Sequence, residues 1–404
     1  MRVKEKHDQE YMKRQNRTLV LNIIKNKRPI SRADIAKITR MSPTSVGRIV
    51  GELIELGLIK ETGQSSNAQD SNGPGRKSTQ LDLDPNSVFT IGLYLDQDVM
   101  EIGVVDFEGR VTYQESIEYD SKLPQDVVAL IVKTVGRVIA ANRIEVSKII
   151  GLGVVMPGII DFKRGVVIFS AQLGWSNVAI VRLLQEKLNI RTAVDNEVKL
   201  RALAESLYGA ARNSQTAIFL SLGSGVGSAL IVGGEIYRGE TNFAGEIGHT
   251  TVDPYGILCD CGRRGCLQTY IASGALIQEA NKVRKVGSFK EIIAAAQDRE
   301  NWAVSILERA SVYAAIAINN AICMYSPDTV VLSGRLVEKY PVMAKLIEEK
   351  CEQYIWEHFK GTFQIKYSAL GGNAEILGAA TLVLNTYLKI EDHKNSDYEG
   401  ERIG

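Results

Sequence analysis

Residues 31–61 read SRADIAKITRMSPTSVGRIVGELIELGLIKE, and this stretch contains the start and stop signals of two short helices and a strand. Ser31, with Asp34 three residues later, is typical of a capping box, in which side chains bind the free backbone N–H groups of a first helical turn. A turn at residues 39–41 separates this helix from the next one. Upstream, residues 18–24 show the apolar face of a further helix, which a proline ends.

The second helix of this stretch is predicted to start at Ser42-Pro43. Ser is a preferred N-cap residue, and Pro in the first turn lacks an N–H that would have no partner there. Gly57 ends the helix, and Leu58–Glu61 is predicted as a strand. Apolar residues at helical spacing predict the buried face of the helix: Val46, Ile49, Val50, Leu53 and Ile54.

This order of helices and strands predicts a winged helix-turn-helix domain over residues 1–85, with its wing in the polar loop 63–74. The helix after the turn would enter the major groove of double-stranded DNA, and the cations after the wing would meet phosphate or the minor groove. The candidate DNA contacts are Ser42, Thr44, Ser45, Arg48, Arg76 and Lys77. A three-helix protein-interaction module is the alternative.

The charge distribution favours DNA binding by this N-terminal domain. Residues 1–61 contain 14 Lys and Arg against 7 Asp and Glu, although the whole chain of 404 residues has a net charge of only +1. A basic domain on a mildly acidic remainder predicts that only the basic part meets a polyanion.

The composition argues against a membrane or secreted protein. With 45% hydrophobic and 24% charged residues it is ordinary for a soluble globular protein, and no apolar run is long enough to span a bilayer. The N-terminal residues are charged and lack the apolar segment of a secretory signal. Five cysteines, an odd number, argue against a disulfide framework. We therefore expect a cytoplasmic protein.

Residues 86–385 alternate between strand and helix signals, which predicts an α/β body. Residues 87–103 and 104–113 alternate as a β-hairpin that turns at 107–110. This pattern of hairpins, buried strands and glycine-rich turns predicts two related lobes around a cleft. The other predicted elements are a helix over 124–142, a strand over 148–155, a strand over 217–222 leading into the glycine-rich turn 223–227, a helix over 302–324 and a strand over 329–334.

Three of the five cysteines and one of the four histidines lie within eighteen residues, in GHTTVDPYGILCDCGRRGC at 248–266. Three thiolates and one imidazole make a closed tetrahedral set typical of structural zinc, which leaves no open position for catalysis. We expect one Zn²⁺ per chain, bound by His249, Cys259, Cys261 and Cys266. The alternatives are four unconnected core residues or a disulfide, although Cys259 and Cys261 are too close in sequence for easy disulfide geometry.

Together these motifs resemble the ROK family, named for repressors, open reading frames and kinases. The resemblance covers about residues 15–385 and points to the family's sugar-responsive repressors, of the xylose-repressor and N-acetylglucosamine-repressor type, because most of its kinases lack the N-terminal domain. The matching stretches are FAGEIGH at 243–249, the cysteine knuckle, MPG at 156–158, LGW at 173–175, the 223–227 turn and ALAE at 202–205.

The resemblance implies an α/β fold: an N-terminal winged helix-turn-helix and a two-lobed actin-like (ribonuclease H-like) body of the ATPase and hexokinase type. The expected domains are residues 1–85, a first lobe over 86–195 joined by a C-terminal segment at about 375–390, and a second lobe over 196–374 that carries the zinc knuckle. The resemblance also implies a set of sugar contacts by position: Gly158, Asn196, Glu197, Glu246, His249 and Gln268.

Two departures from the family's kinases argue against catalysis. The kinases carry Asp-x-Gly-Gly-Thr in their first hairpin, whereas this chain has Asp96-Gln97-Asp98, which contains no glycine and two carboxylates that would repel phosphate. At the position of the kinases' catalytic Asp, this chain has Glu197, and the longer side chain of Glu would displace the catalytic oxygen. Gln268 stands where the family usually has Glu, so the hydroxyl pattern recognised is expected to differ from that of glucose.

We therefore expect a cytoplasmic transcriptional regulator, a repressor rather than an enzyme, that binds a sugar or sugar derivative in its cleft. A recognition helix covers only a few base pairs, so a homodimer or homotetramer on a pseudo-palindromic operator is expected. An active ATP-dependent sugar kinase with an appended DNA-binding domain is one alternative. A repressor controlled by a protein partner is another.

Overall fold

The computed structural model describes residues 16–17, 19–21, 23–25, 27–64 and 78–390. The chain forms two compact units, each assembled from separate segments. Unit 1 comprises Met1–Val154, Ile180–Ala193 and Ala379–Gly404, and unit 2 comprises Val155–Ala179 and Val194–Gly378. Unit 1 thus holds both the N-terminal domain and the first part of the body, and the predicted three-domain division remains a proposal.

The N-terminal domain has the predicted helix-turn-helix. Helix α2 (Arg32–Thr39) is capped by the Ser31 hydroxyl, which accepts a hydrogen bond from the Asp34 N–H at 3.1 Å. Helix α3 (Pro43–Glu55) is capped in the same way by Ser42, which accepts from the Ser45 N–H at 3.1 Å. The predicted helix starts are therefore confirmed, and the predicted apolar face of α3 is buried except for Ile54, which is half-buried.

A small antiparallel sheet completes this domain, in the order β1-β3-β2. Its strands are β1 (Ile30–Ser31), β2 (Ile59–Gln64) and β3 (Thr79–Leu83). Strands β2 and β3 flank the predicted wing, but residues 65–77, with Arg76 and Lys77, lie outside the described residues. Strand β1 was not predicted, because two residues carry no alternation that could indicate a strand.

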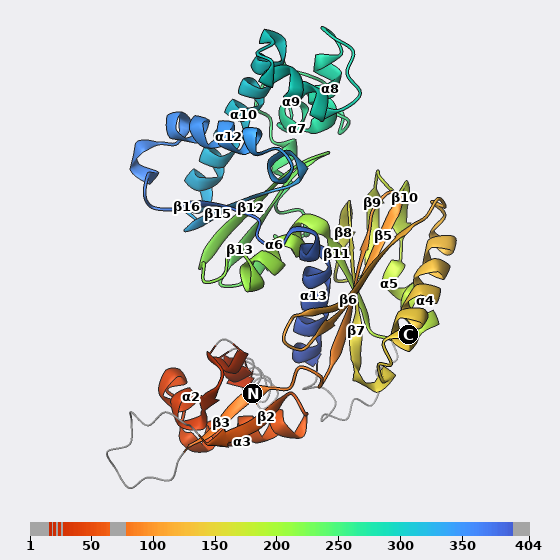
Figure 1. Ribbon diagram of the computed structural model, residues 1–404, viewed down its shortest axis with the longest axis vertical. Coiled ribbons are helices and arrows are strands. Elements are labelled where there is room, and N and C mark those ends of the chain that lie inside the picture. The colour runs from red at the N-terminus through yellow and green to blue at the C-terminus, as the bar shows by residue number, and fades with distance from the viewer. Residues whose placement is uncertain (1–15, 18, 22, 26, 65–77, 391–404) are drawn as a thin grey trace, which may run out of the picture. The chain divides into compact units, whose positions relative to one another are not determined.

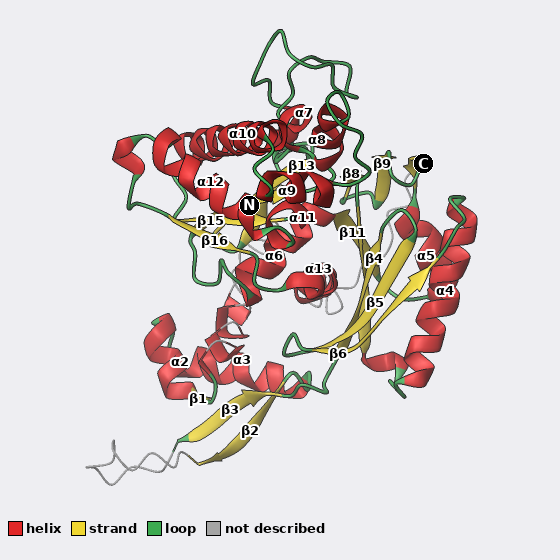
Figure 2. Cartoon of the chain, turned by 45° about the horizontal axis from the view of Figure 1, so that its top comes forward, coloured by secondary structure: helices red, strands yellow, loops and turns green. Residues whose placement is uncertain are grey.

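The large sheet of unit 1 has the strand order β11-β7-β4-β5-β6. Helices α4 (Pro124–Ala141) and α5 (Ile180–Leu188) lie on one face of this sheet, and α13 (Ala374–Ile390) lies on the other (Figures 1 and 2). A methyl group on Gly153 of β7 would lie 2.1 Å from the Ala379 carbonyl oxygen, so glycine allows α13 to pack closely. The strands are β4 (Phe89–Leu95), β5 (Val99–Asp106), β6 (Val111–Glu118), β7 (Ile149–Met156) and β11 (Thr192–Asn196).

The first hairpin differs from the prediction. The expected single strand over 87–103 is broken into β4 and β5 by a turn at Asp96–Asp98, in addition to the predicted turn at 107–110. The Asp96 N–H bonds to the Val99 carbonyl at 2.9 Å and closes this turn. The buried apolar residues fall at odd positions before this turn and at even positions directly after it, a change of phase that the prediction of one strand overlooked.

The N-terminal domain and the sheet of unit 1 share one apolar core. Phe107 from the β5–β6 turn and Val383 from α13 are buried in the same cluster as Leu58 and Leu83 of the N-terminal domain. The Phe107 N–H also donates to the Pro85 carbonyl at 3.2 Å. The N-terminal domain is therefore packed onto the body within this unit.

Unit 2 contains a five-stranded sheet in the order β14-β13-β12-β15-β16. The glycine-rich turn joins β12 to β13 as an antiparallel hairpin, as predicted, while β15 runs parallel to β12. Its strands are β12 (Thr216–Leu222), β13 (Val226–Val232), β14 (Glu235–Tyr237), β15 (Thr329–Ser333) and β16 (Gln364–Tyr367).

Helix α6 (Glu197–Tyr208) packs on β12 and β13, and a second helical layer is built around the long helix α10 (Asn301–Tyr325). A small sheet in the order β10-β9-β8 lies in the same unit. Its strands are β8 (Ile159–Asp161), β9 (Val166–Ser170) and β10 (Trp175–Val178). The other helices are α7 (Gln268–Ile271), α8 (Ser273–Ala280), α9 (Phe289–Gln297), α11 (Arg335–Glu338) and α12 (Pro341–Tyr354), with short 3-10 turns η1 (Val146–Lys148), η2 (Ile247–His249), η3 (Glu357–Phe359) and η4 (Gly371–Asn373).

Among the described residues, no helix combines the length and apolar character that a membrane crossing requires.

Candidate functional site

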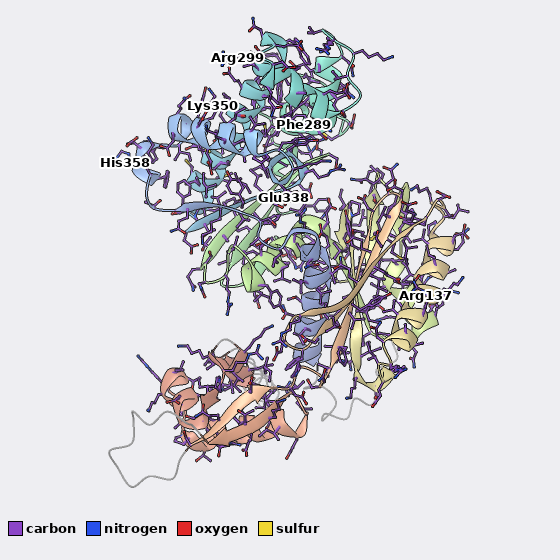
Figure 3. All side chains as sticks on the ribbon, in the orientation of Figure 1. Arg137, Phe289, Arg299, Glu338, Lys350 and His358 are labelled. Carbon is purple, nitrogen blue, oxygen red and sulfur yellow. The ribbon has the colours of Figure 1, made fainter. Side chains whose placement is uncertain are left out.

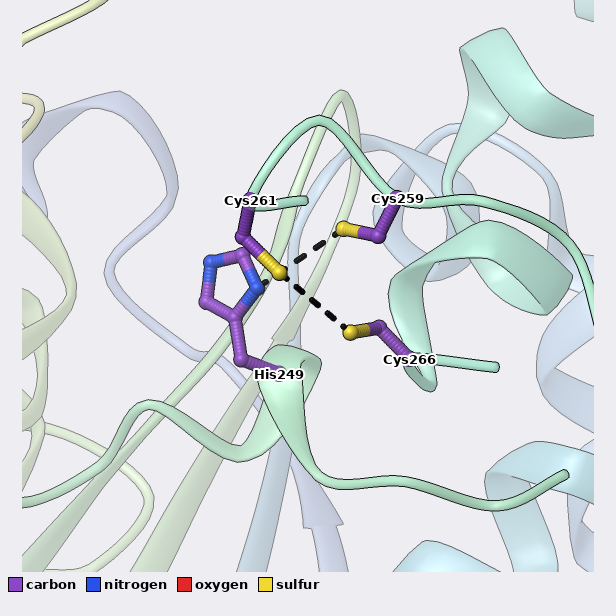
Figure 4. Close-up of side chains that lie close together, drawn as sticks. All are labelled: His249, Cys259, Cys261 and Cys266. Carbon is purple, nitrogen blue, oxygen red and sulfur yellow. Dashed lines mark hydrogen bonds between the residues drawn. The ribbon is translucent and has the colours of Figure 1, made fainter. Parts of the chain in front are cut away.

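The four predicted metal ligands come together in unit 2 (Figure 4). Their ligand atoms all lie within 4.8 Å of one another, with His249 Nδ1 3.8 Å from Cys259 Sγ and Cys261 Sγ 3.6 Å from Cys266 Sγ. Cys259 and Cys266 are buried, whereas Cys261 is exposed. This cluster has the composition and the spacing of a metal-binding site.

The backbone of the knuckle explains how four residues of one loop converge. The Cys259 N–H donates to the Arg263 carbonyl at 2.7 Å, which closes a tight turn, and Gly262 within it has a φ of +84°. At Gly265, where φ is +67°, a methyl group would lie 1.5 Å from the Asp253 carbonyl oxygen. Only glycine fits there, because a left-handed conformation and a close backbone approach coincide.

The thiols of the cluster differ in acidity. A backbone hydrogen bond from Arg263 lowers the pKa of Cys261 to about 7, while burial raises the pKa of Cys266 to about 12. Metal binding requires the thiolate, so the lowered pKa of Cys261 favours the form that binds a metal ion.

A second group of predicted residues meets at the start of α6. Asn196 caps this helix, since its Oδ1 accepts from the Val198 N–H at 2.9 Å, and its Nδ2 donates to the Gly158 carbonyl at 2.9 Å. Gly158 has a φ of +122°, and a methyl group on it would lie 2.4 Å from the Phe169 carbonyl oxygen. Glu197 follows as the first residue of α6. Two of the predicted contacts are thus directly bonded, although 38 residues separate them.

Glu246 and His249 lie in one helical turn, as their spacing predicted. Glu246 precedes η2 and its carbonyl accepts from the His249 N–H at 3.1 Å. Two glycines allow this segment to pack closely against strand β13. Methyl groups on Gly245 and Gly248 would lie 2.0 and 2.1 Å from the carbonyl oxygens of Ser228 and Val226. Glu246 is exposed and His249 half-buried, so both remain accessible to a ligand.

Gln268 belongs with the metal cluster. Its Nε2 lies 3.2 Å from Cys259 Sγ and donates a hydrogen bond to it. Groups that bind a ligating atom orient that atom and tune its charge, so Gln268 is placed to support Cys259 if this cluster binds a metal ion.

The sequence did not single out a buried polar network beside these residues. Asp195 is fully buried and pairs with Arg238, which also donates to Asn242 Oδ1 at 3.1 Å. Asn242 in turn accepts a hydrogen bond from Lys199 Nζ at its backbone carbonyl, at 2.5 Å. One signal was present: Lys199 lies in the first turn of α6, between the apolar residues Val198 and Leu200.

The described DNA-contact candidates lie at the start of α3. Thr44 and Arg48 are exposed, Ser45 is half-buried, and the Ser42 hydroxyl is used as the helix cap. Arg48 Nη1 lies 2.8 Å from Glu52 Oε1, one helical turn later. The guanidinium is thus paired within its own helix in the DNA-free protein.

In the turn between β4 and β5, the Asp96 carboxylate is hydrogen-bonded to neighbouring groups of the protein. The Gln97 N–H donates to Asp96 Oδ1 at 2.8 Å, and the Tyr94 hydroxyl donates to Asp96 Oδ2 at 3.2 Å. The Tyr119 hydroxyl donates to the Asp96 carbonyl. Burial, with the nearby carboxylates of Asp96 and Asp98, raises the pKa of Tyr119 to about 12.

Comparison with known proteins agrees with this architecture. The sequence profile of winged helix-turn-helix DNA-binding domains matches residues 13–60, and that of the ROK family matches residues 90–386. The xylose repressor of Bacillus spizizenii is 27% identical over 383 residues, which cover 95% of this chain and 98% of that protein. The N-acetylglucosamine repressor of Escherichia coli O6:H1 is 27% identical over 389 residues, covering 94% of each chain.

A solved structure has the same fold over nearly the whole chain. The crystal structure of a ROK family transcriptional regulator, described as a homologue of the MLC protein of Escherichia coli, superposes with a TM-score of 0.81 at 23% identity. The match covers 95% of this chain and all of that one. A winged helix-turn-helix followed by an actin-like α/β body, with a family match over most of the sequence, shows that this chain belongs to the ROK family.

Proposed function

We propose that this protein is a DNA-binding transcriptional repressor of sugar-metabolism genes, and that a sugar or sugar derivative bound in unit 2 controls it. The observation that carries the proposal is the joining of a winged helix-turn-helix to a ROK body whose candidate hydroxyl-binding residues all lie on one unit. Relatives that match over nearly their full length are named as xylose and N-acetylglucosamine repressors.

The chemistry of the candidate residues suits a polyhydroxyl ring. Glu197 and Glu246 supply carboxylates that accept hydrogen bonds from hydroxyls, Asn196 supplies an amide and His249 an imidazole. Gly158 would contribute its backbone, since the space of a side chain there is taken by Phe169 and Ser170. We include Gln268 in this set, where it would link the sugar to the metal cluster.

The protein is proposed to bind a sugar without phosphorylating it. Phosphoryl transfer depends on positioning and on neutralising the phosphate charge. In the Asp96–Asp98 turn, the Gln97 N–H is already bonded to the Asp96 carboxylate, and the two carboxylates of this turn would repel a phosphate. Glu197 in the position of the family's catalytic Asp supports the same conclusion.

We propose that the His249, Cys259, Cys261 and Cys266 cluster binds one structural Zn²⁺ per chain. Four soft or borderline ligands and no water position fit a tetrahedral structural ion, which stabilises the loop that carries His249. In this way the metal would hold one wall of the sugar site without taking part in chemistry.

The DNA partner is proposed to be a pseudo-palindromic operator bound by a homodimer or homotetramer in the cytoplasm. Thr44, Ser45 and Arg48 would read bases from the N-terminal half of α3, next to the Ser42 cap. Arg76 and Lys77, which lie outside the described residues, would contact phosphate. One recognition helix spans too few base pairs for a specific operator, which is why two are required.

The test combines operator binding and sugar phosphorylation on the full-length protein. We expect D-xylose, N-acetylglucosamine or another monosaccharide of a thermal-shift panel to change operator affinity at least tenfold, which requires only ~1.4 kcal/mol of preference for one state. Glu246→Ala should abolish this response and leave sugar-free operator affinity unchanged. Glu349→Ala, at an exposed position of α12, is the matched control.

Two outcomes would favour other functions. Robust ATP-dependent phosphorylation of a sugar that has no effect on operator binding would indicate a kinase with an appended DNA-binding domain. Operator binding with no thermal shift by any sugar or sugar phosphate would indicate a repressor controlled by a protein partner.

A further inference from the structure

A buried cation lies beside the candidate sugar-binding residues. Lys199 is only 3% exposed and sits three residues after Asn196, on the same turn of α6. Burial lowers the pKa of Lys199, and the nearby carboxylates of Asp195 and Glu246 oppose this shift. Lysine is rarely buried without a partner, because its ammonium group loses hydration there.

The partner is a backbone group of a distant segment. Lys199 Nζ donates to the carbonyl oxygen of Asn242 at 2.5 Å. Asn242 is 8% exposed and has a φ of +63°, a left-handed conformation that asparagine tolerates better than most residues. Its Nδ2 also donates to the Ile160 carbonyl at 2.7 Å. The segment that leads to Glu246 is therefore bound at one residue by both main chain and side chain.

The charged groups around Lys199 are also paired with one another. Asp195 accepts from the Asn196 N–H at 2.8 Å and pairs with Arg238. The Arg238 guanidinium stacks on the Phe162 ring at 3.9 Å, and the Arg238 carbonyl accepts from the Ala244 N–H at 3.3 Å. Each buried charge thus has a partner on the opposite segment, so removing one leaves another unsatisfied.

We propose that Lys199 is a positioning residue of the sugar site: by binding the Asn242 carbonyl it holds the 238–246 segment to the first turn of α6. Asn196 and Glu246 are fifty residues apart in the sequence, and this link keeps them in one site. The inference rests on the proposed function for its ligand, although the link itself can be measured without one.

The test compares Lys199→Met with wild type in the full-length, metal-loaded protein. Calorimetry with D-xylose and with N-acetylglucosamine should show at least about tenfold weaker binding of whichever sugar wild type binds, because hydrogen bonds to charged groups contribute most among such contacts. Hydrogen exchange without sugar should accelerate over residues 242–249 and stay unchanged in α10 and α12. Lys345→Met, an exposed lysine of α12, should alter neither measurement.

Two further variants separate a positioning role from general stability. Lys199→Arg keeps a charged donor and should recover part of the affinity that Lys199→Met loses. Arg238→Gln removes the ion pair with Asp195 from the same network and should accelerate exchange over the same residues. If Lys199→Met does not fold, unchanged exchange over 242–249 in Arg238→Gln overturns the inference.

Wild-type affinity and wild-type exchange in Lys199→Met would also overturn it. If neither sugar binds wild type, the proposed effector class is wrong for these two sugars, while the exchange data still decide whether Lys199 holds the segment.

Discussion

The side-chain amide of Asn196 donates to the carbonyl of Gly158 at 2.9 Å, while its oxygen caps helix α6. One residue thus joins the turn after β7 to the helix that carries Glu197. Asn is suited to both tasks because its amide is a donor and an acceptor at once.

Asn196→Asp should separate these two tasks. Asp caps a helix about as well as Asn, but it has no N–H to donate to Gly158. We expect about tenfold weaker sugar binding, with less loss of stability than in Asn196→Ala, which should lose a further ~1 kcal/mol from the missing cap. Calorimetry and urea denaturation measure the two effects. Wild-type sugar affinity in Asn196→Asp would show that the Gly158 contact is dispensable.

Loss of a metal ligand should release zinc and destabilise unit 2. Protein purified without chelator should contain about one zinc per chain, and Cys261→Ser should lose it with a clear drop in melting temperature. Cys323→Ser, at an exposed cysteine outside the cluster, is the control. Elemental analysis decides, and wild-type protein free of zinc would refute the assignment.

Arg48→Ala should weaken operator binding by ~1–3 kcal/mol if Arg48 contacts a base. Wild-type affinity of this variant for every DNA tested would refute the assignment of α3 as the recognition helix.

Glu52→Gln should have the opposite effect on DNA binding. The ion pair at 2.8 Å holds Arg48 within its helix, and the Glu52 carboxylate also repels phosphate. We therefore expect tighter operator binding and no loss in the double variant beyond that of Arg48→Ala. Fluorescence anisotropy at fixed salt measures both, and weaker binding by Glu52→Gln would contradict this account.

Glu338 should make part of the stability dependent on pH. One of its oxygens accepts from the Ser333 hydroxyl at 2.6 Å, the Gly334 N–H at 2.9 Å and Arg201 Nη2 at 2.8 Å; Figure 3 labels its position. Burial alone would raise the pKa of Glu338, but these hydrogen bonds and the Arg201 charge lower it overall. The stabilisation is therefore present above the ordinary glutamate pKa and is lost as the pH falls through the lowered value.

Glu338→Gln should accordingly cost ~1 kcal/mol or more near pH 7, and the difference from wild type should shrink below about pH 4. Denaturation across this range tests it, with exposed Glu349→Gln as control. A difference that grows towards low pH would contradict the assignment.

The core shared by the N-terminal domain and the body should make them unfold together. Phe107 is 4% exposed within this core, and its truncation to Ala should cost ~3–5 kcal/mol. Protection of the β5 and β7 amides from hydrogen exchange and operator binding by the N-terminal domain should be lost at the same urea concentration. Loss of operator binding well before the loss of this protection would show that the shared core does not couple them.

Much of the fold follows from local signals. The caps at Ser31 and Ser42, the glycine-rich turn between β12 and β13 and the long helix α10 were all predictable, because each depends on interactions within a turn or two of chain. Strand β1 was not predictable, since its pairing partner Leu81 is fifty-one residues from Ile30. The predicted 87–103 strand overlooked the turn at Asp96–Asp98, although the buried apolar positions change from odd to even there.

Some residues of the candidate site could likewise be found from the sequence, whereas their contacts could not. Residue type and spacing alone determined the metal cluster, since His249 and three cysteines lie in one short segment that glycines allow to close. Motif position placed Asn196 and Glu246 among the predicted sugar contacts. Only the tertiary structure showed that Lys199 binds Asn242, that Asp195 pairs with Arg238 and that Arg48 is held by Glu52. Buried polar groups need a partner from whichever segment packs against them, and no local period in a sequence records which segment that is.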